Sequence, residues 1–331
     1  MGIQKFSKIL QKNLPYFVVA TIVSAILVGN YFPNVPKILK GYTYITVFWM
    51  LIPMMVTANM AGVAKVFVDP KLVMSAVILN FVITPPLGKI FATIFYHHQP
   101  VLLPVGYLLN MVTPCSSMVI TWTAFAGGSI EVATAVVALS LLLAIGFIPV
   151  WMWVLTHTWV NVPIGIIFKN LAIIVIIPII AGYIIRTILI KKMGEKKFSS
   201  RIKPSMPGLS SLGMYAIVFI AMSDVAKKII AHPEYIVLIA TSMGAYYFAL
   251  WGIAILWAKV GKFSYGEAVA LSYSVTAKNL AITIAIAIVT WGGLAVLVPA
   301  FDPVIQVPVM MAFLYLSTKL KPLFSEKVKV G

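Results

Sequence analysis

A lysine stands among hydroxyl and amide side chains in the stretch YSVTAKNLAI at 273–282. A sodium ion needs several oxygen ligands, usually including a carboxylate. Oxygens are available here on Ser272, Ser274, Thr276, Asn279 and Thr283. The nearest acid, Glu267, is about three helical turns away, and Lys278 itself repels a cation. We therefore interpret Lys278 as a built-in cation standing where other proteins bind an ion.

A second polar cluster, NMVTPCSS at 110–117, surrounds a proline. Pro114 lacks an amide hydrogen and its ring disfavours a continuous helix, so carbonyls about one turn earlier are freed for a ligand. They lie beside the only thiol of the chain, Cys115. An ordinary proline kink is the alternative for this cluster alone. The predicted substrate-binding residues of both clusters are Thr113, Pro114, Cys115, Ser116, Ser117, Thr276, Lys278 and Asn279.

Sulfur and imidazole groups are weaker candidates for ligands. Met111, Cys115 and Met118 have the i, i+4, i+7 spacing of one helix face, which would suit a metalloid or copper(I), but Pro114 interrupts that spacing. His97 and His98 have no third ligand nearby in sequence. We expect no metal site and no cofactor.

Composition identifies the surroundings of both clusters. Of 331 residues, 61% are hydrophobic and 10% charged, far from the mixture of a soluble domain. Twenty-five bases against eight acids lie in short clusters between apolar runs, which suits anionic membrane surfaces rather than nucleic acid. The chain is predicted to be an all-α integral membrane protein, where Lys278 costs at least about 3 kcal/mol unless it faces a cavity or partner. Snorkelling towards an interface is the alternative for Lys278.

Apolar runs of about 20 residues, enough to cross the hydrocarbon core, predict ten transmembrane helices. Their ranges are 14–33, 43–64, 72–96, 101–126, 130–155, 163–187, 208–230, 234–258, 264–291 and 294–318. The basic N-terminus could serve a secretory signal, but no clear cleavage site follows, so we interpret it as a retained first span. Most clustered bases fall in alternate loops, which the positive-inside rule makes cytoplasmic. Both termini are therefore expected in the cytoplasm of a multi-pass plasma-membrane protein.

The long polar connection at 186–204 divides the chain into five-helix halves, 1–157 and 158–331. An odd number of spans per half requires an inverted repeat. Each half carries an interrupted span, helix 4 with the proline cluster and helix 9 with Lys278, and each interruption precedes a Gly-Gly turn. Paired interruptions of this kind predict the binding site of a transporter.

Four stretches resemble the arsenical-resistance permease family, within the bile-acid:sodium symporter superfamily. They are MMVTANMAGVAKVFVDPKLVMSAVILNFVITPPLG, PCSSMVITWTAFAGGSIEVATAVVAL, and KNLAITIAIAI with DPVIQVPVM. The resemblance implies a panel domain (helices 1, 2, 6 and 7), a core domain (helices 3–5 and 8–10) and crossing of broken helices 4 and 9. It also implies a functional cysteine at Cys115. The family commonly has glutamates where this chain has Asn279 and Gln306, and sodium-coupled relatives have amide and acidic ligands where it has Ser272, Thr276 and Lys278.

Ion coupling is assigned to three residues. The resembling fold brings Asp302 towards Lys278 as a candidate partner. Burial disfavours a charged lysine, so Lys278 could exchange a proton when its partner is removed. Replacing Lys278 by methionine is expected to lower fold stability, because the charge would hold the broken helix ends together. Glu131 is either a proton carrier or an acid at a helix start. Asp224 is expected to pair with Lys227 or Lys228 at an interface.

The sequence thus predicts a secondary active transporter rather than an enzyme, because no P-loop and no nucleophile–base pair occurs. Its substrate is a small molecule, with arsenite-like metalloid efflux favoured and sodium coupling disfavoured. An organic anion held by Lys278 and the half-helix N-termini is the first alternative. A membrane receptor is the second. No nucleic-acid partner is expected, and a monomer is favoured.

Overall fold

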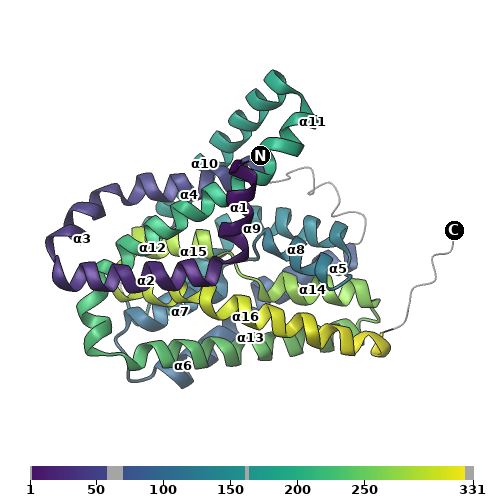
Figure 1. Cartoon of the computed structure of the whole chain (residues 1–331). Helices are drawn as coiled ribbons and strands as arrows, with labels where there is room; N and C mark the ends of the chain where they lie inside the picture. The colour runs from purple at the N-terminus through teal and green to yellow at the C-terminus, as the bar shows by residue number, and fades with distance from the viewer. Residues whose placement is uncertain (1, 58–69, 161–163, 325–331) are drawn as a thin grey trace.

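The computed structural model describes residues 2–57, 70–160 and 164–324, and within these ranges the regular elements are all helical (Figure 1). The end of the predicted span 43–64, residues 65–69 of the following basic loop and the tail after residue 324 lie outside the described residues. The α-helices are α1 (Gly2–Lys12), α2 (Leu14–Tyr31), α3 (Asn34–Leu39), α4 (Thr43–Thr57), α5 (Pro70–Ile78), α6 (Thr84–Tyr96), α7 (Leu102–Val112), α8 (Met118–Phe125), α9 (Ile130–Thr156), α10 (Ile164–Met193), α11 (Glu195–Lys197), α12 (Met206–Ala231), α13 (Glu234–Val260), α14 (Tyr265–Thr276), α15 (Leu280–Thr290) and α16 (Leu297–Leu320).

Eight helical stretches among the described residues are long and apolar enough to cross a membrane. They are Leu14–Tyr31, Asn34–Thr57, Pro70–Tyr96, Ile130–Thr156, Gly165–Met193, Glu195–Ala231, Glu234–Val260 and Gly293–Leu323. The two other predicted spans, 101–126 and 264–291, are each divided into two shorter helices, α7 with α8 and α14 with α15. The prediction of a multi-pass all-α membrane protein is confirmed, whereas ten crossings in an inverted repeat stay a prediction.

Four long helices pack closely as one group. Helix α12 packs against α2 and α4, and α4 also packs against α10. Glycine permits the close approach: a Cβ on Gly29 of α2 would overlap the carbonyl oxygen of Ser223 on α12. Likewise, a Cβ on Gly213 of α12 would lie 2.5 Å from the amide nitrogen of Met50 on α4. Small residues let membrane helices gain dispersion contacts that lipid cannot supply. We call α2, α4, α10 and α12 the four-helix group.

The remaining long helices surround the interrupted ones. Helix α13 packs against α14 and α16, and α7 packs against α6, α9 and α16. Helix α7 also contacts the turn η6 (Gly293–Val296), where a Cβ on Gly106 would overlap the carbonyl oxygen of Ala295. This packing brings the start of α7 to the segment that follows the end of α15. The two interrupted helices therefore run antiparallel through the interior.

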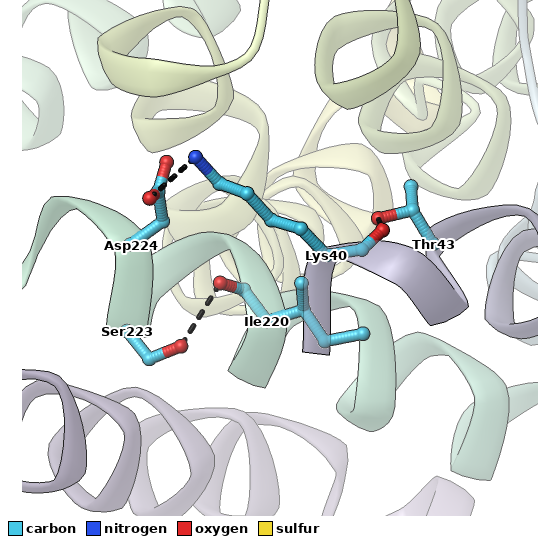
Figure 2. A network of polar contacts seen from close by, with 5 residues as sticks. All are labelled: Lys40, Thr43, Ile220, Ser223 and Asp224. Atoms are coloured by element: carbon cyan, nitrogen blue, oxygen red, sulfur yellow. Dashed lines mark hydrogen bonds and ion pairs between the residues drawn. The ribbon is translucent and has the colours of Figure 1, made fainter. Parts of the chain in front are cut away.

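Asp224 pairs with a lysine from the other half of the chain. Its carboxylate oxygen lies 2.7 Å from Nζ of Lys40, which enters from η1 (Lys40–Tyr42) before α4 (Figure 2). The expected pairing with Lys227 or Lys228 on the same helix is therefore wrong. A lysine three or four residues from Asp224 is a local alternative, but the packing of α12 against α4 supplies Lys40 instead.

Breaking this pair is expected to change stability little. The two side chains are 54% and 26% exposed, so solvent screens their attraction. We expect Asp224→Asn to lower the free energy of unfolding by no more than about 1 kcal/mol. Thermal unfolding of Asp224→Asn, Lys40→Gln and the double variant, in low and high salt, measures the coupling. A coupling energy several times larger would show that the pair is shielded from solvent.

Candidate functional site

The two helix interruptions lie side by side and bind each other through the backbone. The amide of Ser116, between α7 and α8, donates to the carbonyl of Ala277 at 3.0 Å. The amide of Asn279, between α14 and α15, donates to the carbonyl of Pro114 at 2.9 Å. Each bond satisfies groups that a broken helix leaves without a helical partner. We call residues 113–117 and 277–279 the crossing.

Cys115 and Lys278 are the directly opposed residues of this crossing. In an antiparallel pair with this bonding pattern, opposed residues have Cα atoms about 4.5 Å apart and side chains on the same face. Cys115 is 2% exposed and Lys278 is fully buried. These two residues are 163 positions apart in the sequence (278 − 115 = 163), yet they are neighbours inside the protein.

Four helix ends meet at the crossing and give it a mixed electrostatic character. Helices α8 and α15 begin here, and their free amides favour negative charge. Asn279 caps α15, because its Oδ1 accepts from the amide of Ile282 at 3.3 Å. Lys278 comes directly after the C-terminal end of α14, whose carbonyls favour positive charge. The crossing therefore tolerates a lysine and also offers helix N-termini to an anion or a polar substrate.

The ammonium group of Lys278 has no hydrogen-bond partner among the described residues. The expected direct pair with Asp302 is not formed. Instead, the Asp302 carboxylate accepts from the Tyr247 hydroxyl at 2.8 and 2.9 Å, from Nδ2 of Asn110 at 2.8 Å and, more weakly, from Nε2 of Gln306 at 3.5 Å. Neutral donors from α7, α13 and α16 thus hold the buried acid. Lys278 is left with unused donors, which is costly at zero exposure.

Most hydroxyl groups that could have served a cation are engaged within their own helices. Each donates to a carbonyl three or four residues earlier: Ser272 to Val269, Ser274 to Ala270, Thr276 to Ser272, Thr283 to Asn279 and, in the other cluster, Thr113 to Leu109. These bonds satisfy hydroxyls buried in apolar surroundings. Their local role is to stabilise the two interrupted helices.

A cavity of about 380 Å³ lies between the crossing, the four-helix group and α9. Cys115, Ser117 and Asn279 line one side, and Met54, Thr57 and Lys203 line another. A smaller cavity of about 120 Å³ shares Met54, Thr57, Ser117 and Asn279 and adds Ser116 and Lys278. The larger volume is typical of small-molecule sites. Five of the eight predicted substrate-binding residues, from both halves of the chain, therefore line one or both cavities, whereas Thr113, Pro114 and Thr276 line neither.

The other candidate residues lie away from these cavities. Glu131 is exposed in the first turn of α9 and lines neither one. His97 and His98 are exposed and contact each other at 3.3 Å. No group of three or more His, Cys, Asp or Glu suited to a metal ion occurs in the part of the chain that the structure describes.

The three sulfur-bearing side chains do not line a common cavity. Met111 is buried, and the Cβ of Met111 lies 2.8 Å from the Cβ that Gly88 of α6 would carry. Met118 instead lines the smaller cavity, and Cys115 lines the larger one. The break at Pro114 places the three side chains in different surroundings, as the interrupted spacing predicts.

Three residues of the site carried little signal in the sequence. Lys203 belongs to a basic segment that the charge pattern assigns to the membrane surface, yet it lines the larger cavity. Asn80 donates from Nδ2 to the carbonyl of Ser274 at 2.9 Å and so supports α14. Tyr247 holds Asp302. A lone amide or hydroxyl in an apolar span is a signal for such a role, because it needs a partner there.

Comparison with known proteins agrees with this architecture. The chain is 23% identical to the arsenical-resistance protein Acr3 of Alkaliphilus metalliredigens, over 96% of this chain and 94% of that protein. It is 24% identical to an uncharacterized transporter of Synechocystis, over 93% and 88%. It is 28% identical to the uncharacterized sodium-dependent transporter YocS of Bacillus subtilis, over 62% of each chain.

The model of the Sodium Bile acid symporter family matches residues 44–232, more than half of the chain. This range includes α4, α12 and the first half of the crossing. The matched family is one of symporters, which are membrane transporters and not enzymes, and two of these relatives are named as transporters. With its interrupted helices bonded to each other inside an apolar helical bundle, this chain is a multi-pass membrane transporter that belongs to the Sodium Bile acid symporter family.

Proposed function

We propose that this chain exports arsenite or a similar trivalent metalloid by alternating access, without sodium. The observation that carries the proposal is the position of Cys115, at the crossing and in the lining of the larger cavity. A thiolate is a soft ligand suited to a soft metalloid. The similarity to Acr3, a protein named for arsenical resistance, supports the same substrate.

A single thiol suits transport better than storage. Cys115 is the only cysteine of the chain, so the site lacks the three thiolates that would trap arsenic tightly. Hydroxyl and amide groups of Ser117, Thr57 and Asn279 line the same cavity and can bind the hydroxyls of arsenous acid. Binding is then favourable enough for recognition and weak enough for release.

Movement would occur between the four-helix group and the helices that carry the crossing. The four-helix group corresponds to the panel domain, and α5–α9 with α13–α16 correspond to the core domain. The cavities lie at this boundary, on the side of Lys203 and the basic segment that we place in the cytoplasm. The proposal includes ten crossings in two inverted halves, 1–157 and 158–331, both termini in the cytoplasm of a plasma-membrane protein, and a monomer.

Arsenite accumulation tests the proposal directly. Everted membrane vesicles or proteoliposomes containing the full chain are expected to accumulate arsenite when a proton gradient that is acidic inside is imposed, because protons leaving the lumen drive arsenite inward in exchange. Empty vesicles and vesicles with a collapsed gradient provide the baseline. Absence of gradient-dependent arsenite movement in correctly inserted protein would reject the metalloid substrate.

Transport is expected to be independent of sodium. Lys278 occupies the crossing, Asp302 is already engaged by Asn110 and Tyr247, and the Ser and Thr hydroxyls are bonded to helix carbonyls. Among the described residues of the crossing, no carboxylate is left for the oxygen ligand set that a sodium ion usually needs. We expect equal rates in sodium and potassium buffers of the same ionic strength. Accumulation driven by a sodium gradient, with potassium unable to replace it, would contradict this.

An organic anion is the second candidate, favoured by the charge of the cavities. Lys203 lines the larger cavity and Lys278 the smaller one, and neither lining includes an acid among the described residues. The N-termini of α8 and α15 add to the positive potential. Competition between arsenite and organic carboxylates or sulfonates in the same proteoliposomes distinguishes the two candidates.

A further inference from the structure

The N-terminal helix is separate from the first membrane-spanning helix. The basic N-terminus is predicted to be the retained start of the first span, but α1 ends at Lys12 and α2 begins at Leu14. In Figure 1, α1 runs across the direction of α2 instead of continuing it. Because α2 is a membrane-spanning candidate, α1 lies at the end of a span, where the membrane meets water.

The exposed surface of α1 is both basic and apolar. Lys5, Lys8 and Lys12 follow i, i+3, i+7 spacing and lie along one side of the helix. Phe6 and Ile9 form the neighbouring stripe and are 52% and 44% exposed. An exposed apolar stripe beside a basic one is typical of helices that lie in the membrane interface.

The opposite side of α1 is fixed to the connection between the two halves. Gln4 donates from Nε2 to the carbonyls of Ser200 and Arg201, at 2.7 and 3.0 Å. The buried Ser7 hydroxyl donates to the carbonyl of Pro204 at 3.0 Å and accepts from the amide of Gly208 at 3.0 Å. These bonds position α1 against η4 (Phe198–Ile202), η5 (Lys203–Ser205) and α12.

A groove of about 1210 Å³ lies between α1 and this connection. Its apolar lining includes Phe6, Ile202, Met206, Leu209 and Leu212, and Arg201 lies among them. One part of the groove is therefore apolar enough to hold an acyl chain, and another part carries the positive charge of Arg201. It shares none of its lining residues with the larger cavity at the crossing.

Charge identifies the occupant. The segments 2–12 and 191–203 contain nine lysines and arginines, Lys5, Lys8, Lys12, Lys191, Lys192, Lys196, Lys197, Arg201 and Lys203. The only acid in these two segments is Glu195. Its Oε1 lies 3.9 Å from Nη2 of Arg186 and accepts a hydrogen bond from the Ser199 hydroxyl at 3.4 Å. Basic clusters at the end of a membrane span attract anionic lipids, and an arginine binds a phosphate through two parallel hydrogen bonds.

We infer that the groove between α1 and residues 200–212 binds an anionic phospholipid, with the acyl chain against Phe6, Met206 and Leu209 and the headgroup phosphate on Arg201. The lipid would tie α1 to the connection between the halves. This inference is independent of the transported substrate, because it concerns a surface outside the crossing.

Lipid-dependent stabilisation tests the inference on the purified full chain in detergent. Dioleoylphosphatidylglycerol is titrated while thermal unfolding is followed, with dioleoylphosphatidylcholine and inorganic phosphate as comparisons. We expect the anionic lipid to raise the unfolding temperature in a saturable manner, and the other two to have little effect. Equal stabilisation by phosphatidylcholine would reject headgroup recognition, and equal stabilisation by phosphate would reject a lipid.

Two variants locate the site. Arg201→Gln removes the paired donors and is expected to weaken apparent phosphatidylglycerol binding about tenfold. Phe6→Ala removes an exposed apolar contact and is expected to weaken binding of the long-chain lipid more than that of a short-chain analogue. Lys259→Gln, at the exposed end of α13, makes the same change in charge away from the groove and is the matched control. The same loss in Lys259→Gln as in Arg201→Gln would show nonspecific charge attraction and reject the site.

Discussion

Lys278→Met is expected to insert into the membrane and fold, but to lose proton-driven transport by about a hundredfold or more. Methionine keeps most of the apolar stem of the side chain, while it removes the charge and the exchangeable proton. Slow exchange of substrate without a gradient is expected to remain, because the cavity wall is preserved.

The surroundings of Lys278 explain this expectation. Its ammonium group is fully buried and has no hydrogen-bond partner within the part of the chain that the structure describes, while Asp302 is held by Tyr247 and Asn110. A charged lysine in such a place is unfavourable unless an anion approaches or the side chain meets water in another conformation. Lys278 can therefore release its proton in one state and take it up in another, which is the requirement for coupling.

The structure also changes the expected effect on stability. From the sequence alone, Lys278→Met is expected to destabilise the fold by removing a charge that holds the helix ends. The helix ends are instead held by backbone bonds of Ser116 and Asn279, which the substitution leaves intact. Replacing an unpaired buried charge by a hydrophobic side chain is often neutral or stabilising. We therefore expect an unchanged or higher unfolding temperature.

Transport and unfolding must be measured on the same preparations. The pH dependence of substrate counterflow and of gradient-driven uptake is compared for the wild type, Lys278→Met and Lys259→Met, the last being an exposed control at the end of α13. A wild-type rate and an unchanged pH profile in Lys278→Met would falsify the coupling role. Lys278 would then be a buried lysine without function in transport.

Cys115→Ser is expected to abolish arsenite resistance in a sensitive host while the protein is made and inserted normally. A hydroxyl is a poor ligand for a soft metalloid, although serine is nearly isosteric with cysteine. The Cys115 thiol lies 3.3 Å from the Ser140 hydroxyl on α9, and serine at this position can keep that contact. Loss of function is then a consequence of ligand chemistry and not of packing.

Two controls separate ligand chemistry from structure. Cys115→Ala removes the Ser140 contact as well as the thiol, and Ser140→Ala keeps the thiol but removes the contact together with the bond from Ser140 to the carbonyl of Val136. We expect arsenite transport in Ser140→Ala and in neither cysteine variant, with similar unfolding temperatures for all three. Resistance at the wild-type level in Cys115→Ser would remove the thiol from the mechanism. Retained transport of an organic anion in that variant would favour the second candidate function.

Much of the site could be predicted because its causes are local. Pro114 interrupts a helix wherever the helix packs, since the missing amide hydrogen and the bulk of the ring belong to the residue itself. The apolar runs on either side of Lys278 determine its approximate depth in the membrane, because hydropathy is also a property of neighbouring residues. The structure places both clusters at one crossing, as expected, but the partners of Lys278 and Asp224 could not be derived in this way.

Those partners depend on the rotation and position of helices from distant parts of the chain. Asp302 accepts a hydrogen bond from Asn110, which is 192 residues away in the sequence. A shift of one position along a helix turns a side chain by about 100°, so a small error in helix rotation replaces the residue that contacts Asp302 by an adjacent one. Lys40 reaches Asp224 because α12 packs on α4, whereas local spacing favours Lys227 and Lys228. The separate helix α1 likewise depends on bonds from Gln4 and Ser7 to the distant connection.

The sequence by itself determined that this chain is an apolar helical membrane protein with two interrupted spans, because hydropathy and proline chemistry act over a few neighbouring residues. Only the tertiary structure decided that Cys115 faces Lys278, that Asp302 is held by neutral donors and that α1 closes a groove. Those contacts join surfaces separated along the chain, and packing of whole helices decides which side chains meet.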